Sequence, residues 1–132
     1  QGWIRKNNNK KISHDFSIIK SLPFFNIIFF SEEEISSAKI TINELIDLAK
    51  ILVITNGKHG STIYYNKQIL RIDAQITNPI DTLGAGDIYA AVFSTIYFKT
   101  KNLIIAGEKA SKIASKSTEY KGLKSINSKI LM

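Results

Sequence analysis

Two short apolar runs, separated by residues with a helical pattern, place the strongest constraint on the fold. FFNIIFF (residues 24–30) and ILVIT (residues 51–55) are apolar almost without a break, which is typical of strands covered on both faces. Between them, SEEEISSAKI and TINELIDLAK indicate two helices, the second with Ile42, Leu45, Ile46 and Leu48 or Ala49 on one side. The sequence therefore predicts an α/β fold: a layered domain with a mostly parallel sheet flanked by helices.

The rest of the chain continues this alternation. We expect a strand end at GWIR, a polar loop to about Lys11, a short helix in SHDFSIIKSL that stops at Pro23, and a hairpin of STIYYN and QILRID around Asn66-Lys67. Two more helices are expected, from about Gly86 to Phe98 and from Asn102 to about Tyr120, the second closed by Gly122.

Three loops stand out because each is expected to follow a strand. They begin at Ser31, at Thr55, and at Asp81 after a segment near Ile80. In open α/β sheets, ligands bind outside the carboxyl ends of the strands. We therefore expect the three loops to share one edge of the sheet.

Charge and composition exclude several classes of function. The net charge of +7 invites a nucleic-acid interpretation, but there are only two arginines and the lysines are spread along the chain. The one basic cluster, residues 5–11, contains an asparagine run typical of a flexible loop. No cysteine is present, which favours a reducing, cytoplasmic location, and no apolar run is long enough to span a bilayer. We expect neither nucleic-acid nor membrane partners.

The segment DTLGAGD, residues 81–87, carries the clearest chemistry. Gly84 and Gly86 allow a tight turn and close approach of the backbone to a ligand. The amides from Gly84 to Asp87 would lie at a helix N-terminus, where an anion is favoured, and the Asp87 carboxylate would lie beside it. This pattern suits phosphoryl transfer to a hydroxyl. The structural alternative is an aspartate that merely stabilises a helix N-terminus, by at most about 1 kcal/mol.

DTLGAGD resembles the D-T-x-G-A-G-D signature of the PfkB/ribokinase family of carbohydrate kinases. The resemblance implies an ATP-dependent phosphotransferase that moves the γ-phosphoryl group to a hydroxyl of a sugar or nucleoside-like acceptor. It implies that Asp87 is the catalytic base and that Gly84, Ala85 and Gly86 form the anion hole. Asp81 and the carbonyl of Leu83 resemble the monovalent-cation site of the members that use K⁺.

Other segments resemble the family in the same order along the chain. ITNGKHGS is similar to the family's T-x-G-x-x-G turn beside ATP, which implies that Thr55, Gly57 and Gly60 bind nucleotide. SEEE resembles the N-x-x-E motif, which implies that Glu34 helps to organise Mg²⁺ and phosphate. QGWIR and YKGLKSI also resemble segments of the family.

Each of these segments has a structural alternative. Ser31 and Glu34 also fit a capping box, and residues 55–60 also fit a simple strand end and turn. We expect His14 and His59 to be solvated loop residues. Tyr89, Phe93 and Tyr97 share a helical face that is typical of a core. No cluster of ligating residues predicts a tightly held metal, so Mg²⁺ is expected to arrive with ATP.

The resemblance implies that residues 1–132 form one partial kinase domain, which is the C-terminal, nucleotide-binding portion. The N-terminal half, with the acceptor-binding segment and the β lid, is expected to be missing. The acceptor and the oligomeric state therefore stay open. A non-catalytic remnant or nucleotide-binding module is the alternative to an active kinase.

Overall fold

The computed structural model describes residues 5–8, 11–14 and 24–121, the first two segments by their backbone alone. One sheet has the strand order β3-β4-β5-β6, and β1 and β2 form a separate two-stranded sheet. The chain divides into two compact units: residues 1–56 with 62–69, and residues 57–61 with 70–132. These are the first and the second unit.

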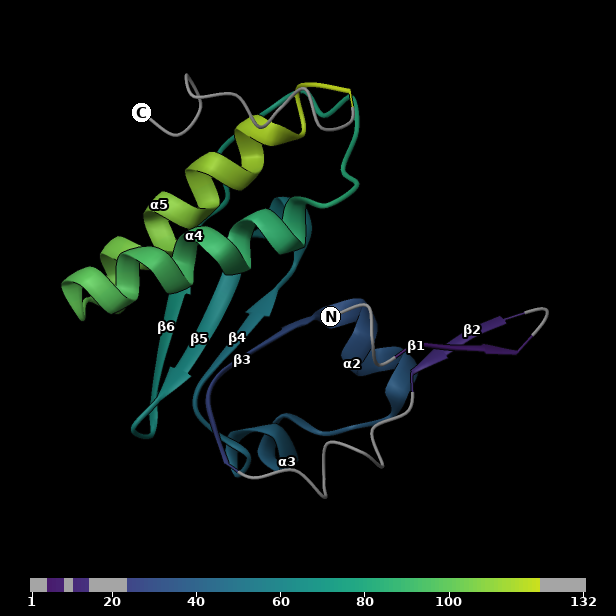
Figure 1. Ribbon diagram of the computed structural model, residues 1–132, viewed down its shortest axis with the longest axis vertical. Helices are drawn as coiled ribbons and strands as arrows, with labels where there is room; N and C mark the ends of the chain where they lie inside the picture. Colours follow the sequence, from purple (N-terminus) through teal and green to yellow (C-terminus); the bar gives the residue numbers. More distant parts are fainter. Residues whose placement is uncertain (1–4, 9–10, 15–23, 122–132) are drawn as a thin grey trace. The chain divides into compact units, whose positions relative to one another are not determined.

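The first unit contains the predicted strand–helix–helix–strand segment. β3 (Phe25–Ser31), α2 (Glu32–Ala38), α3 (Ile42–Ile46) and β4 (Ala49–Thr55) follow one another. β3 and β4 pair in parallel, from Phe25 opposite Ala49 to Ser31 opposite Thr55 (Figure 1). A core of buried side chains lies between these elements: Phe30, Ile40, Leu45, Leu52 and Ile54. The apolar pattern corresponds to burial along most of β4, whereas in β3 Phe30 is buried and the other apolar side chains are half-buried.

α2 and α3 begin with capping boxes. Ser31 caps α2 together with Glu34, and Thr41 caps α3 together with Glu44. The prediction for the second helix was too long, because α3 ends at Ile46 and Ala49 already pairs with Phe25 in the sheet. Only Leu45 of this short helix is buried, while Ile42 and Ile46 are exposed.

The hairpin around Asn66-Lys67 is confirmed. β5 (Ser61–Tyr65) and β6 (Gln68–Ile72) are neighbours in the sheet and are joined by these two residues alone. Asn66 and Lys67 have φ of 48° and 60°, the two positive values that a type I′ turn requires. The described sheet therefore combines a parallel pair with a hairpin and is mixed.

The polar N-terminal loop is where the expectation was wrong. β1 (Arg5–Asn8) and β2 (Lys11–His14) form an antiparallel hairpin, with Arg5 opposite His14. Strand pairing uses backbone groups, so a polar segment can pair without an apolar pattern. Ser13 and His14, expected to begin a helix, lie in β2, and the rest of that expected helix lies outside the described residues. Gly122, the expected C-cap, lies outside them as well.

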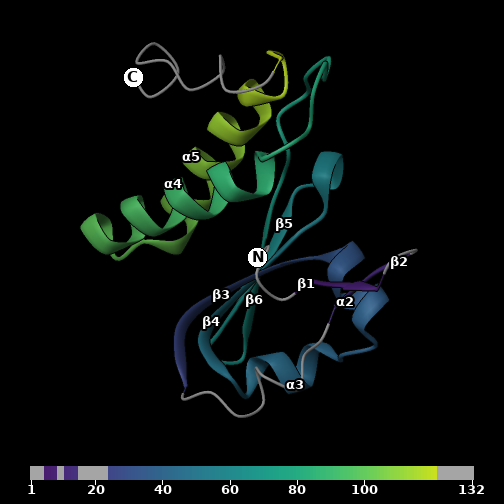
Figure 2. The ribbon, with the colours of Figure 1, turned by 45° about the vertical axis from the view of Figure 1, so that its right-hand side comes forward.

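The second unit is built on two helices that pack side by side, α4 (Ala85–Thr100) and α5 (Leu103–Ser117) (Figures 1 and 2). Tyr89 and Phe93 are the buried residues of α4. α5 buries small residues, which lets the helices approach closely: Ala106, Gly107, Ala110, Ser111, Ala114 and Ser117. The prediction of a core role is confirmed for Tyr89 and Phe93, whereas Tyr97 is half-buried.

The strand expected near Ile80 is absent. Residues 73–82 form no helix or strand, and Ile80 is 70% exposed. The amides of Ile80 and Asp81 instead donate to the carbonyl of Thr118, just after α5, at 2.7 and 2.9 Å. This loop is therefore held by the end of a helix rather than by a sheet.

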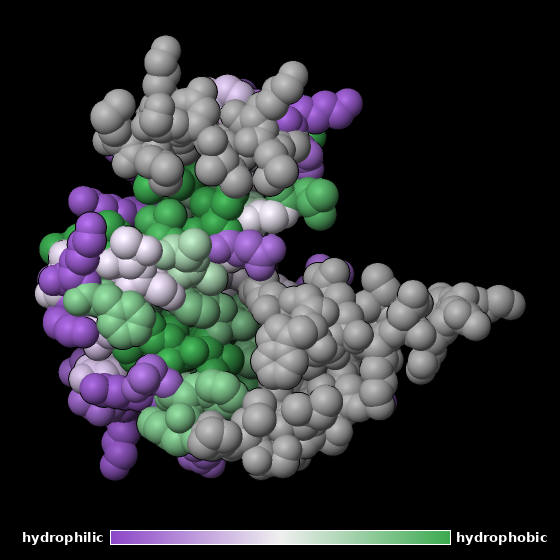
Figure 3. All heavy atoms as spheres, in the orientation of Figure 1, coloured by the Kyte–Doolittle hydropathy of each residue, from purple (hydrophilic) through white to green (hydrophobic). Residues whose placement is uncertain are grey.

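Apolar side chains also reach the surface. Figure 3 shows apolar atoms on the face turned to the viewer, bordered by hydrophilic side chains. Over all the described residues, the most exposed large apolar side chains are those of Phe24, Ile69, Ile76, Ile80 and Leu83. Among the described residues, no helix has the length and apolar character needed to cross a bilayer.

Candidate functional site

In the first unit, the carboxyl ends of β3 and β4 bring together the polar residues predicted there. Ser31 and Thr55 are register partners, and the Thr55 hydroxyl lies 3.5 Å from the carbonyl oxygen of Phe30. The expectation that these two loops share a sheet edge is confirmed. The third loop belongs to the second unit.

Glu34 forms a capping box with Ser31 at the start of α2. Its Oε2 accepts from the Ser31 amide at 2.9 Å, and the Ser31 hydroxyl accepts from the Glu34 amide at 3.1 Å. Glu34 is 7% exposed. The structural alternative for SEEE is thus present in the molecule, while a role in organising Mg²⁺ stays a prediction.

In the second unit, the turn GKHG places its two glycines in different surroundings. Residues 57–59 form a 3₁₀ turn, η2, and the Gly60 amide donates to the Gly57 carbonyl at 3.2 Å. Gly60 has φ of +88°, and a Cβ there would lie 2.1 Å from the carbonyl oxygen of Ile72. Gly57, with φ of +48°, has open space around it. Close backbone packing therefore requires Gly60, whereas Gly57 leaves room beside the turn.

The loop before α4 contains an Asx turn. Asp81 Oδ1 accepts from the Leu83 amide at 3.0 Å, which bends the chain toward Gly84. Together with the bonds from Ile80 and Asp81 to Thr118, this contact sets the course of the loop. The carboxylate of Asp81 thus shapes the turn, and cation binding by Asp81 and Leu83 stays a prediction.

Gly84 is the N-cap of α4 and has φ of 80°, a left-handed conformation that suits glycine. No side chain caps the helix, and a Cβ at Gly84 would meet nothing within 4 Å. Of the amides predicted to form the anion hole, that of Ala85 donates to Thr82 at 3.2 Å. Within the described residues, no hydrogen bond is recorded for the amides of Gly84, Gly86 and Asp87.

The chemistry of this helix start follows from three amides that bond nothing among the described residues and from its one acidic residue. The macrodipole of the 16-residue α4 adds partial positive charge at its first turn. Asp87 is exposed, and it is the acidic residue of that turn. Unpaired amides there favour an anion, and an accessible carboxylate can accept a proton.

A contact that was not predicted joins the GKHG turn to α4. The hydroxyls of Ser61 and Tyr89 lie 2.7 Å apart, and each residue is 5% exposed. Burial raises the pKa of Tyr89 above its ordinary value, although the hydrogen bond with Ser61 acts in the opposite direction. The sequence offers no local signal for this pair, because 28 positions separate its members.

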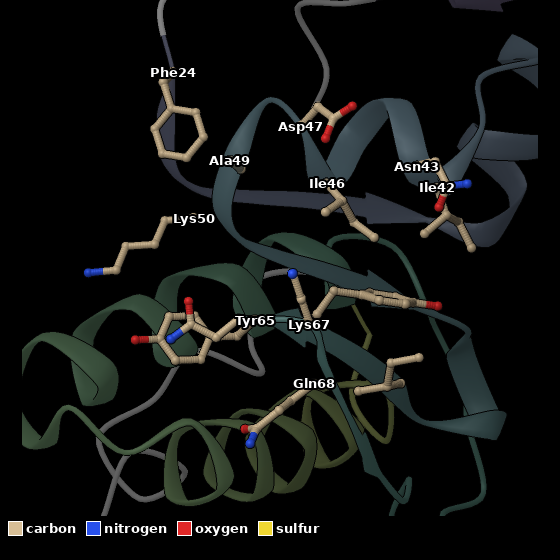
Figure 4. A pocket seen from close by; sticks show the side chains of 13 residues that line it. Phe24, Ile42, Asn43, Ile46, Asp47, Ala49, Lys50, Tyr65, Lys67 and Gln68 are labelled. Carbon is tan, nitrogen blue, oxygen red and sulfur yellow. The ribbon is translucent and has the colours of Figure 1, made fainter.

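A separate hollow lies at the opposite end of β4 from Thr55. It measures about 550 Å³ in the first unit, and Figure 4 shows residues of α3 along one side and of the β5–β6 turn along the other. Its lining includes Phe24, Ile42, Ile46, Lys50, Tyr65 and Lys67. None of the predicted site residues lines it. In the part of the chain that the structure describes, no three His, Cys, Asp or Glu residues are grouped as a metal ion would need.

Comparison with known proteins identifies relatives among small-molecule kinases. A nucleoside kinase of Methanothermobacter thermautotrophicus is 34% identical over 102 residues, which cover 74% of this chain and 33% of that protein. The crystal structure of the Methanocaldococcus jannaschii nucleoside kinase, a member of the ribokinase family, matches with a TM-score of 0.67 at 27% identity, covering 80% of this chain and 38% of that one.

An uncharacterised sugar kinase from Pyrococcus horikoshii, solved in complex with ATP, also has a TM-score of 0.67, at 28% identity, with 82% of this chain and 36% of that one covered. The chain spans about a third of the length of the curated relatives it matches. The model of the pfkB family of carbohydrate kinases matches residues 12–130. The chain therefore belongs to the pfkB carbohydrate kinase family, and its α/β layered fold is that of the ribokinase-like enzymes.

Proposed function

We propose that the chain forms the nucleotide side of an ATP-dependent phosphotransferase that moves the γ-phosphoryl group to a hydroxyl of a sugar or nucleoside. The observation that carries this proposal is the start of α4. A glycine N-cap, an exposed carboxylate and three amides without a hydrogen bond in the described part of the chain, those of Gly84, Gly86 and Asp87, occur together there. Membership of the family and the nucleoside and sugar kinases among the relatives support the reaction class.

In this proposal each residue at the start of α4 has a distinct task. The amides of Gly84 and Gly86, with the helix dipole behind them, hold the phosphoryl oxygens, and the open space beside Gly84 leaves room for them. The amide of Ala85 takes part only if it gives up its bond to Thr82. Asp87 accepts the proton of the attacking hydroxyl. ATP supplies the phosphoryl group, and the Mg²⁺ that accompanies it neutralises charge.

The remaining predicted residues support the nucleotide. Gly57 has open space in which a ligand can approach the backbone, and Gly60 holds the turn against β6. Thr55 and Glu34 lie at the strand ends of the first unit, where we propose that they contact nucleotide and magnesium-bound phosphate. We propose Asp81 and the Leu83 carbonyl for a monovalent cation such as K⁺, next to the turn they already shape.

The test compares Asp87→Asn with a matched control, Asp73→Asn. Asp73 is an exposed aspartate of the same unit whose backbone carbonyl, not its carboxylate, makes the recorded contact, with Ser111. The assay uses the purified protein that contains this chain together with its acceptor side, with ATP-Mg and a panel of sugars and nucleosides. Asp87→Asn should lower kcat by roughly 10²–10⁴-fold, the usual contribution of a general base. Its affinity for ATP should not change, because the phosphate donors are backbone amides.

Other outcomes of this experiment distinguish a kinase from its alternatives. If the folded Asp87→Asn variant keeps its turnover, Asp87 only stabilises the helix. If the unaltered protein, with its acceptor side present, binds ATP by calorimetry but phosphorylates no acceptor in the panel, a nucleotide-binding module replaces the kinase. Absence of ATP binding contradicts both.

A further inference from the structure

The buried hydrogen bond between Ser61 and Tyr89 lies next to both halves of the proposed nucleotide site in the second unit. Ser61 directly follows Gly60, at the end of the GKHG turn, and Tyr89 lies two residues after Asp87. Two residues rotate the chain by about 200° around a helix. Asp87 therefore faces solvent while Tyr89 is buried on the other side of the same helical turn.

One end of this contact is anchored firmly. Gly60 packs so closely on the backbone of Ile72 and Ala74 that a Cβ there would overlap the Ile72 carbonyl. Ser61 is the next residue and begins β5. Because the turn cannot shift without losing this packing, the Ser61 hydroxyl is a fixed point to which α4 is attached.

Stability alone does not account for a hydroxyl pair at this position. A phenylalanine would fill nearly the same volume as Tyr89, and its ring could still stack on Phe93, where the centroids lie 6.1 Å apart. A buried hydroxyl loses its hydration and regains roughly that free energy from one hydrogen bond. What the pair adds is direction, since a short hydrogen bond fixes the rotation and height of the helix in a way that apolar packing does not.

We propose that the Tyr89–Ser61 hydrogen bond is a positioning contact that holds the first turn of α4, with Asp87 and its free amides, in register with the GKHG turn. This inference rests on the proposed function and adds to it two positioning residues. Phosphoryl transfer depends on placement more than on covalent chemistry. A displacement of about 1 Å can cost on the order of 100-fold in rate.

The experiment uses Tyr89→Phe, Ser61→Ala, the double variant and the control Tyr97→Phe. Tyr97 lies two turns further along α4, and no hydrogen bond of its hydroxyl is recorded among the described residues. We expect Tyr89→Phe and Ser61→Ala each to lower kcat about tenfold, with KM for ATP changed far less, because alignment is lost rather than nucleotide contacts. The double variant should be no slower than either single one, since both remove the same bond.

The outcomes separate this inference from the proposed function. A lower melting temperature with unchanged kcat per folded molecule would mean that the bond is merely structural. If Asp87→Asn abolishes turnover while Tyr89→Phe behaves like Tyr97→Phe, the positioning role alone is overturned. If the unaltered protein, with its acceptor side present, shows no turnover, or Asp87→Asn retains it, the proposed function fails and this inference fails with it.

Discussion

α4 and α5 are neighbouring helices of nearly equal length in the same unit, yet they begin in opposite ways. α5 starts after Asn102, whose Oδ1 accepts from the amides of Ile104 and Ile105, both at 3.0 Å. α4 starts after Gly84, and no side chain caps it. α5 satisfies its first amides internally, whereas at the start of α4 the amides of Gly84, Gly86 and Asp87 have no hydrogen bond within the described part of the chain.

The difference is informative because capping is the rule among the α-helices described. α2 and α3 begin with capping boxes built on Ser31 and Thr41, and α5 has Asn102. α4 is the exception among these four. A side-chain cap stabilises a helix by about 0.5–2 kcal/mol relative to alanine, whereas glycine loses only a few tenths. A glycine start therefore costs the fold little and leaves donors for a ligand.

The variant Gly86→Val tests most directly whether the start of α4 binds a ligand, because it places a branched side chain beside the amides of its first turn. α5 already carries the β-branched Ile104 at the equivalent second position, so such a residue is compatible with a helix start. A hydrogen bond to a charged group contributes about 1.5–3 kcal/mol, so losing one should weaken ATP binding roughly ten- to a hundredfold. Calorimetric titration with ATP measures the change.

Gly86→Ala is the graded companion variant and should weaken ATP binding less. Valine and alanine both favour the helical conformation over glycine, so neither variant should lower the melting temperature through helix propensity. Unchanged ATP affinity in a folded Gly86→Val variant would show that the amides of α4 do not approach the nucleotide.

Removing the cap of α5 tests whether that helix start contributes to stability alone. Asn102→Ala leaves the amides of Ile104 and Ile105 without their acceptor, and should lower the free energy of unfolding by about 1 kcal/mol. ATP affinity should stay the same, because the amides of α5 are not proposed to meet a ligand. Urea titration measures the first quantity and calorimetry the second. A loss of ATP affinity as large as that of Gly86→Val would remove the distinction between the two helices.

Local patterns in the sequence predicted most of the fold. The apolar runs that became β3 and β4, the turn at Asn66-Lys67 and the two long helices each have a signal within a few residues. The errors arose where pairing partners decided the outcome. Ala49 has the periodicity of the preceding helix but pairs with Phe25, and the polar residues of β1 and β2 pair through their backbones.

The residues of the candidate site also differ in whether a local sequence pattern reveals them. Gly84 and Asp87 were found because a glycine turn before a helix is a local pattern, and the structure places them at the N-cap and the first turn of α4. Ser61 and Thr118 were missed because their contacts, with Tyr89 and with the amide of Asp81, join residues far apart in the sequence. Ser61 follows the glycine turn without being one of its motif positions, and Thr118 belongs to no motif, so only the tertiary structure shows these two contacts.

The smallest effect we expect concerns pH and the buried hydroxyl behind α4. Burial raises the pKa of Tyr89 above its ordinary value of 10.0, so the unfolded chain releases this proton at a lower pH than the folded chain. The stabilisation is fully present below about pH 10 and is lost as the pH rises through the folded value. The free energy of unfolding should therefore fall in alkaline solution, and Tyr89→Phe should remove that part of the fall, whereas Tyr97→Phe should keep it. Urea titrations at neutral and alkaline pH measure the difference, and parallel pH profiles for the unaltered chain and Tyr89→Phe would show that the hydroxyl is not buried in solution.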